Sequence, residues 1–239
     1  MNGNFPKKFG QVFLRDKNIA AKEVRALSIA DGDQILEIGP GDGILTDILL
    51  SYPVKLTAVE PDHRFYEALK IRHSELINSG KFTINKESFL DIPPARYNHI
   101  IGNIPYNISS QILFHLLDFD FDSAIMMVQK EFALRLIAKP GTKDYSRLTV
   151  NAGIRSDIKI ISSVNRQVFS PVPAVDSSII EIRKKTCEVD IKKFDAFLIK
   201  IFTMRRKKLS TTLSYNGPLS EKRPGDLTID ELLMVYSRI

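Results

Sequence analysis

The chain has little of the chemistry that holds metals or forms disulfides. It has a single cysteine, Cys187, so no intrachain disulfide can form, and four histidines with that one cysteine provide no metal-ligand cluster. No apolar run approaches the ~20 residues of a membrane-spanning helix. Residues 1–8 lack the apolar core of a secretory signal. These absences predict a metal-free, cytoplasmic protein that is not associated with a membrane.

Positive charge is concentrated at one end of the chain. Residues 1–182 contain 21 Lys and Arg against 21 Asp and Glu, whereas residues 183–239 contain 13 against 7. The whole net charge of +6 therefore lies in the last segment. A basic appendage on a neutral domain indicates a polyanionic partner and favours nucleic acid. The alternative is a lysine-rich tail that serves solubility alone.

Hydrophobic patterning predicts an α/β fold. Short apolar runs alternate with amphipathic stretches, which is typical of a mostly parallel sheet with crossover helices. Asp16 is a candidate cap for the first helix. The composition turns basic and helical after Arg183, so we expect one domain over residues 1–185 and a small helical domain over residues 186–239. The expected strands are residues 34–38, 56–59, 82–84, 99–101, 124–128, 158–161 and 178–182, and later helices are expected at 130–138, 194–204, 205–213 and 230–236.

Residues 103–106 (NIPY) directly follow the apolar run 99–102, which reads as a buried strand. The side-chain oxygen of Asn103 and the turn carbonyls can accept hydrogen bonds from an exocyclic amino group. Pro105 stiffens the turn, and Tyr106 can stack on a flat ring. The pattern favours methylation of a base amino group, although an ordinary Asn-Pro-type turn explains the tetrapeptide alone equally well.

A second motif, residues 37–43 (EIGPGDG), joins the first expected strand to the next helix. Glycines let the backbone approach a ligand, and the helix start offers free N–H donors. The G-x-G-x-G pattern lacks the spacing of dinucleotide sites. Glu60 ends the second strand, where an acid can accept hydrogen bonds from both ribose hydroxyls. The order of these motifs, first the glycine loop, then the acid and then NIPY, favours S-adenosylmethionine over NAD as the cofactor.

The ordered motifs closely resemble those of the small-subunit ribosomal RNA adenine N6,N6-dimethyltransferases. They are similar, more distantly, to those of the erythromycin-resistance methyltransferases of the large subunit. The resemblance covers essentially residues 8–215, and single motifs within it are only moderately specific. The matching segments are residues 9–14, 37–43, 103–110, 129–131, 145–148, 169–177 and 202–209.

The resemblance implies a Rossmann-like, S-adenosylmethionine-dependent methyltransferase domain followed by a small helical domain. It implies dimethylation of two adjacent adenosines near the 3' end of small-subunit ribosomal RNA, with that RNA and the pre-small subunit as partners of a monomer. The candidate catalytic residues are Asn103, Ile104, Pro105, Tyr106 and Phe169. The candidate cofactor contacts are Gln11, Val12, Leu14, Gly39, Gly41, Glu60, Ser88 and Asn103, and the candidate RNA contacts are Arg205, Arg206, Lys207 and Lys208.

Two alternatives remain open at this point. A methyltransferase of the macrolide-resistance type would act on the large subunit, but the full Phe-x-Pro-x-Pro loop after Phe169 and the Arg-Arg-Lys segment favour the small subunit. The second alternative is a non-catalytic small-subunit assembly factor, because Val12 and Ser88 both weaken the cofactor signature. Family members usually have Asn at the first of these positions and an adenine-contacting Asp at the second. Glu87 or Asp91 could replace that Asp.

We predict that Ser88→Asp tightens S-adenosylmethionine binding several-fold. A carboxylate accepts a hydrogen bond from the adenine amino group more strongly than a hydroxyl does. The dissociation constant, measured by calorimetry for both proteins, tests this prediction. An unchanged constant would contradict the view that Ser88 weakens the cofactor site.

Overall fold

The computed structural model describes residues 12–239, and it divides into two compact units. Of the described residues, the first unit contains those up to Lys130 together with Lys159–Lys184, and the second contains Glu131–Ile158 and Lys185–Ile239. One crossing between the units lies between Lys184 and Lys185. Glu131–Ile158 nevertheless groups with the carboxyl-terminal segment, because its apolar residues belong to that segment's core.

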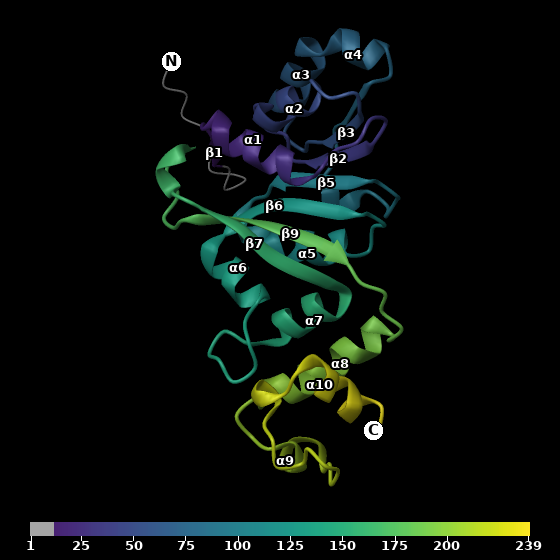
Figure 1. The fold of residues 1–239 in the computed structure, drawn as a ribbon, viewed down its shortest axis with the longest axis vertical. Coiled ribbons are helices and arrows are strands. Elements are labelled where there is room, and N and C mark those ends of the chain that lie inside the picture. Colours follow the sequence, from purple (N-terminus) through teal and green to yellow (C-terminus); the bar gives the residue numbers. More distant parts are fainter. Residues whose placement is uncertain (1–11) are drawn as a thin grey trace. The chain divides into compact units, whose positions relative to one another are not determined.

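A seven-stranded sheet forms the centre of the first unit, in the order β4-β3-β2-β5-β6-β9-β7 (Figure 1). Neighbouring strands from β4 to β6 are parallel, and β9 runs antiparallel to β6. This confirms the predicted α/β class. The strands are β2 (Gln34–Ile38), β3 (Lys55–Val59), β4 (Phe82–Asn85), β5 (His99–Asn103), β6 (Ser123–Gln129), β7 (Ser156–Val164) and β9 (Ser177–Lys184), and the connecting helices are α1 (Lys17–Ala26), α2 (Ile44–Leu49), α3 (His63–Arg72), α4 (Ser74–Asn78) and α5 (Ser109–Leu116).

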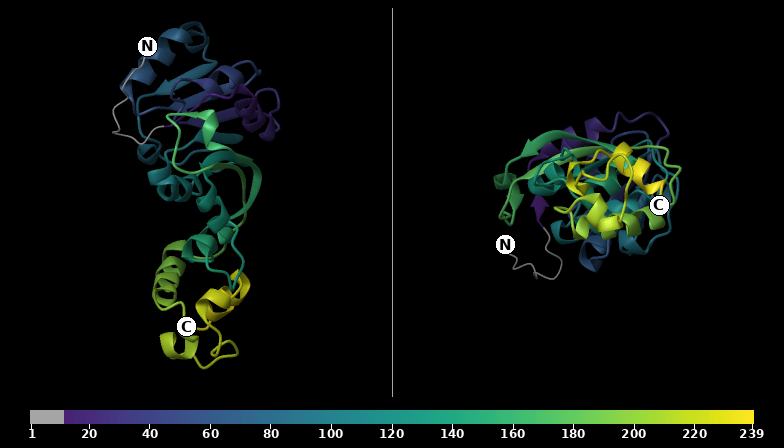
Figure 2. Two further views of the ribbon diagram at one scale, coloured as in Figure 1. Left: turned by 90° about the vertical axis from the view of Figure 1, so that its left-hand side faces the viewer. Right: turned by 90° about the horizontal axis from the view of Figure 1, so that it is seen from below.

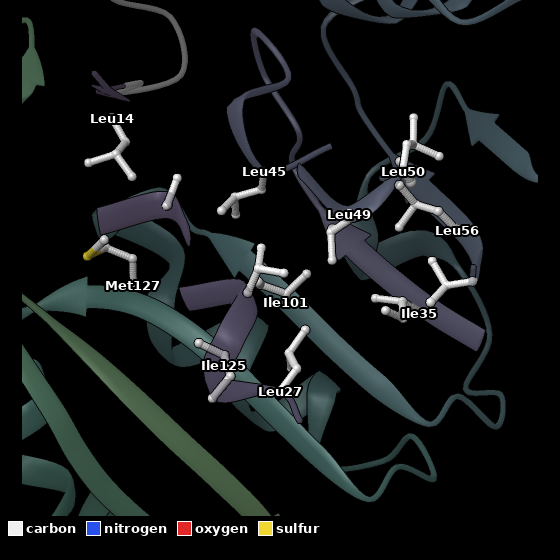
Figure 3. Packing of buried hydrophobic residues seen from close by; sticks show 14 of the residues in the cluster. Leu14, Leu27, Ile35, Leu45, Leu49, Leu50, Leu56, Ile101, Ile125 and Met127 are labelled. Carbon is white, nitrogen blue, oxygen red and sulfur yellow. The ribbon is translucent and has the colours of Figure 1, made fainter. Parts of the chain in front are cut away.

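Both faces of the central strands are buried, as expected for a parallel sheet between helices. Ile100 and Ile101 are consecutive in β5, so they point to opposite faces, and both are fully buried. One face packs against α1 and α2. Figure 3 shows Leu49 and Leu27 among the strand residues Ile101 and Ile125. These helices therefore form the layer that covers the site-bearing strands from one side.

Helix α1 starts where the sequence predicts. The Asp16 carboxylate accepts hydrogen bonds from the backbone N–H groups of Asn18, at 2.8 Å, and Ile19, at 3.3 Å. Two otherwise unpaired donors of the first turn are thereby satisfied. The 3.6-residue period then places Ala20 and Val24 in the core.

The second unit is helical around its own core. Phe194 on α8 is fully buried, and its ring centroid lies 5.2 Å from that of Tyr236 on α10. The two helices lie side by side in Figures 1 and 2. Tyr145 donates a hydrogen bond of 2.7 Å to the Leu227 carbonyl. The helices are α6 (Lys130–Leu136), which begins in the first unit, α7 (Arg147–Arg155), α8 (Ile191–Thr203), α9 (Leu209–Leu213) and α10 (Ile229–Tyr236).

The predicted helix over residues 205–213 is wrong in its first half. Only α9 is helical, and residues 204–206 form a turn. On a helix Arg205 and Lys208, three residues apart, would face each other, and their like charges would repel. The guanidinium of Arg205 instead donates hydrogen bonds of 3.1 Å each to the carbonyls of Thr142 and Lys143.

No helix within residues 12–239 is long and apolar enough to cross a membrane.

Candidate active site

A cavity of ≈ 320 Å³ opens at the carboxyl ends of the parallel strands in the first unit. Strands β2, β3 and β5 all end there, and in open α/β sheets this edge is where ligands bind. The glycine loop, Glu60, Ser88, the NIPY segment and Phe169 all line this cavity. Its walls include Val12, Leu14, Gly39, Gly41, Glu60, Ser88, Asn103, Ile104, Pro105, Tyr106 and Phe169. Gln11 lies outside the described residues.

The glycine loop between β2 and α2 adopts a backbone that other residues rarely accept. Gly39 has φ +65° and Gly41 has φ +57°. A Cβ atom at Gly41 would lie 3.2 Å from the Phe13 ring, so the loop also passes close to a neighbouring side chain. Arg15 holds the loop from outside through a 2.5 Å ion pair with Asp42. The loop backbone is thus positioned to approach a ligand in the cavity.

Glu60 at the end of β3 is almost completely buried. One carboxylate oxygen accepts the Gly41 N–H at 2.9 Å, and the other accepts the Asp62 N–H at 2.8 Å. Burial raises the pKa of this carboxyl, and the two backbone donors lower it. Each oxygen keeps a second lone pair, so Glu60 can still accept hydrogen bonds from ligand hydroxyls.

The NIPY segment begins with the last residue of β5. The side-chain oxygen of Asn103 is buried and has no hydrogen-bond partner within residues 12–239. Tyr106 shares a 2.5 Å hydrogen bond with the hydroxyl of Ser177 at the start of β9. That bond fixes the ring at the cavity wall. Ser177 therefore supports the site, although the sequence motif alone assigns it no such part.

Two short strands bring Phe169 to the cavity. In β1 (Phe13–Leu14) and β8 (Phe169–Ser170), Leu14 pairs with Phe169 across an antiparallel bridge. Phe169 is 4% exposed and belongs to the apolar cluster of the first unit, yet it also lines the cavity. Phe169 is thus both packed in the core and placed at the cavity wall, and its contact with a ligand stays a prediction.

Of the three candidate adenine contacts, Ser88 lines the cavity. Glu87 and Asp91 are exposed and do not line it. Its hydroxyl oxygen accepts the Leu90 N–H at 3.2 Å and so caps a short 3-10 helix, Phe89–Asp91. The serine is thus partly engaged by the protein's own backbone.

The basic residues of the second unit separate into two kinds. Arg205 is bound to loop carbonyls, as described above, and Lys208 forms a 2.5 Å ion pair with Glu221. Arg206 and Lys207 are exposed, and within residues 12–239 their side chains have no ion-pair or hydrogen-bond partner.

Among the residues that the structure describes, no cluster of three His, Cys, Asp or Glu could hold a metal.

Comparison with known sequences identifies the chain. The family described as ribosomal RNA adenine dimethylase matches residues 2–230. The chain belongs to this family of methyltransferases. Ribosomal RNA small subunit methyltransferase A of Malacoplasma penetrans is 42% identical over 217 residues, which cover 89% of this chain and 79% of that protein. The protein of the same name from Thermotoga petrophila is 34% identical over 240 residues, or 97% and 90% of the two chains.

Solved structures of dimethyladenosine and rRNA methyltransferases have the same fold. A dimethyladenosine transferase from Plasmodium falciparum matches with a TM-score of 0.82 and 27% identity, over 95% of this chain and 96% of that one. The 23S rRNA methyltransferase ErmE matches with a TM-score of 0.73 and 25% identity, over 95% and 98%. The predicted Rossmann-like methyltransferase fold is thereby confirmed.

The burial of two acids, Glu37 and Glu23, was not predicted from the sequence. Glu37 precedes the glycine loop, and one of its oxygens accepts the Thr46 hydroxyl at 2.7 Å while the other has no partner. Glu23 on α1 is fully buried, and neither of its oxygens has a partner among the described residues. Helical periodicity could have found Glu23, because it falls on the apolar stripe of Ala20 and Leu27.

We predict that Glu37→Gln flattens the pH dependence of stability. Burial raises the pKa of Glu37 from 4.5 to about 8, against the opposing Thr46 hydrogen bond. Its contribution to stability is therefore full below pH 4.5 and is lost as the pH rises to about 8. Between these limits Glu37 should lower the free energy of unfolding by ~1 kcal/mol per pH unit.

Urea unfolding of wild type and Glu37→Gln at intervals from pH 5 to pH 8 measures this effect. The slope of stability against pH should be smaller in the variant. The exposed Glu87→Gln variant is the matched control and should keep the wild-type slope. Equal slopes in all three proteins would show that Glu37 does not titrate as proposed.

Proposed function

We propose that this dimethylase transfers methyl groups from S-adenosylmethionine to N6 of two adjacent adenosines near the 3' end of small-subunit ribosomal RNA. The observation that carries the proposal is the shared cavity. The Asn103–Tyr106 segment, the glycine loop and Glu60 line it together, so an electrophile and a target amine can meet there. The chain's similarity to small-subunit methyltransferases supports the choice of substrate.

The residues on one side of the cavity fit the cofactor. Glu60 offers a carboxylate with free lone pairs to the ribose hydroxyls. The glycines let the loop backbone lie against the ligand. At Gly41 a Cβ atom would also come too close to the Phe13 ring. Ser88 supplies a hydroxyl for the adenine edge. When bound, S-adenosylmethionine supplies an activated methyl group on a positively charged sulfur, and the protein supplies binding and orientation.

The target base is held by the other side of the cavity. The unpartnered side-chain oxygen of Asn103 needs a donor, and an adenine N6 hydrogen provides one. This bond and one to the Ile104 carbonyl would draw the nitrogen lone pair out of the ring and aim it. Such orientation lowers a barrier by ~7–11 kcal/mol in favourable cases.

Stacking supplies the remaining binding energy for a base that has left its helix. The Tyr106 ring is fixed through Ser177, and Phe169 lies on the β8 side of the cavity. Each stacked base gains ~1–3 kcal/mol. A base with one methyl group has one N6 hydrogen fewer, so the second transfer relies more on these rings. No protein base is required, because the nitrogen becomes acidic once it is alkylated.

Arg206 and Lys207 are the proposed RNA phosphate contacts of the second unit. Both are exposed and without a protein partner among the described residues, whereas Arg205 and Lys208 are already engaged. Partner-free cations can neutralise phosphates without first breaking an intramolecular bond. This narrows the four cations named from the sequence to two principal contacts.

We predict that wild-type protein transfers labelled methyl groups to undermethylated small subunits, and that Asn103→Ala abolishes the transfer. Because Asn103 acts on the target amine, cofactor affinity should stay within several-fold of wild type. Small subunits, large subunits and free RNA are assayed in parallel with radiolabelled S-adenosylmethionine.

Dimethyladenosine recovered from small-subunit RNA is the expected product. Label in the large subunit would instead support the macrolide-resistance activity. Tight binding to small subunits without any label would support a non-catalytic assembly factor. Turnover by Asn103→Ala would refute the part assigned to its amide.

Paired substitution of Arg206 and Lys207 by Ala should weaken RNA binding and reduce its salt dependence. Loss of two phosphate contacts lowers the slope of log affinity against log salt by about 1.5. Fluorescence titration with a small-subunit RNA fragment at several salt concentrations gives this slope. Lys208→Ala, whose ammonium is paired with Glu221, is the control and should change the slope less. A wild-type slope in the double variant would remove these residues from the interface.

A further inference from the structure

An uncharged loop lies beside the cavity in the first unit. Residues 167–175 contain no charged side chain, and the tip of this loop, defined as Pro171, Val172 and Ala174, is exposed. Val172 itself is 52% exposed. A single exposed valine is ordinary on a protein surface, so its meaning depends on how it is held and on what lies around it.

The loop holds its tip in a fixed shape. Val172 lies between two prolines, which restrict the backbone on both sides of it. The base of the loop is closed by Arg166, whose backbone N–H donates to the Asp176 carboxylate at 3.1 Å and whose guanidinium donates to the Ala174 carbonyl at 3.0 Å. A side chain that is ordered before binding loses little entropy when it meets a partner. The loop tip is therefore suited to be a contact surface.

The strand pairing places the loop tip at the rim of the cavity. Ser170 pairs with Phe13 where β1 meets β8, and Phe13 lines the cavity. Phe169, which precedes Ser170, lines it as well. Val172 comes two residues after Ser170, so at most ~7 Å separates their Cα atoms. Nucleotides that flank a base in the cavity would pass this rim.

A cation without a partner lies at the base of the same loop. Lys130 directly follows β6, and its backbone N–H donates to the Asp176 carbonyl at 3.0 Å. Its side chain is exposed, and its ammonium has no ion-pair or hydrogen-bond partner among the described residues. It can thus bind an anion without first breaking an intramolecular bond. An uncharged apolar tip together with a free cation matches a nucleotide, which has an uncharged base and an anionic phosphate.

We propose that the loop tip and Lys130 bind the nucleotide next to the target adenosine, with its base on Val172 and its phosphate on the Lys130 ammonium. The proposal deepens, and rests on, the function proposed for the cavity. A base that leaves its stack uncovers the face of its neighbour. Apolar side chains of other nucleic-acid-binding proteins insert between bases that have lost their stacking. Val172 is placed to cover such a face because it lies at the rim of the cavity that receives the target base.

The two halves of this surface have different physical signatures. Contact between Val172 and a base involves no charge, so it adds to affinity without changing the salt dependence. Contact between Lys130 and a phosphate releases counterions, so it contributes to the slope of log affinity against log salt. Each half can therefore be tested separately.

Binding of a small-subunit RNA fragment that contains the adjacent adenosines, measured by fluorescence titration at several salt concentrations, tests both contacts. Val172→Ser should weaken binding about fivefold, through loss of apolar burial, and leave the salt slope unchanged. Lys130→Gln should lower the slope by about 0.7–0.9. Ile71→Ser and Lys55→Gln are the matched controls and should behave as wild type. Ile71 is 74% exposed near the end of α3, and the exposed Lys55 begins β3 at the sheet edge opposite the cavity.

Two further readouts separate a contact from a change of fold. The kcat/KM for undermethylated small subunits should fall about fivefold in Val172→Ser and stay near wild type in Val172→Leu, which keeps an apolar side chain. The dissociation constant of S-adenosylmethionine should stay near that of wild type in both variants. The Val172 methyl resonances, assigned by their loss in Val172→Ser, should move upfield when the RNA fragment is added, because they then lie over an aromatic ring.

Unchanged methyl resonances together with wild-type binding by Val172→Ser would overturn the assignment of the loop tip, and a wild-type salt slope in Lys130→Gln would overturn that of the cation. Weaker binding of Val172→Ser to whole small subunits, with unchanged binding to the RNA fragment, would mean that a ribosomal protein covers the tip and would also overturn the proposal. If wild type itself transfers no methyl group, the proposed function fails, and the methyl resonances still decide whether Val172 meets a base.

Discussion

The carboxylate of Glu60 joins the two loops on which the cavity depends. One oxygen binds the backbone of the glycine loop after β2, and the other binds the backbone after β3. Without this acceptor, the N–H groups of Gly41 and Asp62 would be left unpaired in a buried place, at a cost of ~1–3 kcal/mol each. The same carboxylate is the proposed ligand of the ribose, so one group shapes the loops and is also proposed to bind the cofactor. Its position at a strand end follows from the parallel sheet, which brings several strand ends to one edge.

Two further acids are buried in the same unit. Glu37 and Asn103 share a face of the sheet, and Glu23 on α1 is fully buried. Burial of such groups lowers stability, and the fold tolerates them beside the site. Of the three buried acids, Glu60 is the one that organises the backbone of the cavity loops.

Much of the fold and of the candidate site could be predicted from the sequence, for identifiable physical reasons. Strands buried on both faces are nearly continuous apolar runs, so β2, β5 and β6 were placed almost to the residue, and Asp16 marked the start of α1. Site residues that follow those strands could be grouped because parallel strands end together. Helix α7 was missed because its polar residues and the preceding break at residues 139–142 hide its buried stripe. Long-range pairing was also invisible. Sequence alone could not show that Arg205 binds loop carbonyls or that Ser177 holds Tyr106.

A crystal structure of the protein with S-adenosylhomocysteine tests the central claim most directly. We expect the ribose hydroxyls on the Glu60 carboxylate, the adenine edge beside Ser88 and the sulfur on the side of the cavity that Asn103 lines. Each of these positions can be read from one electron-density map. Density for the product in another place, or in the cavity without contact to Glu60, would contradict the assignment of this cavity as the methyl-transfer site.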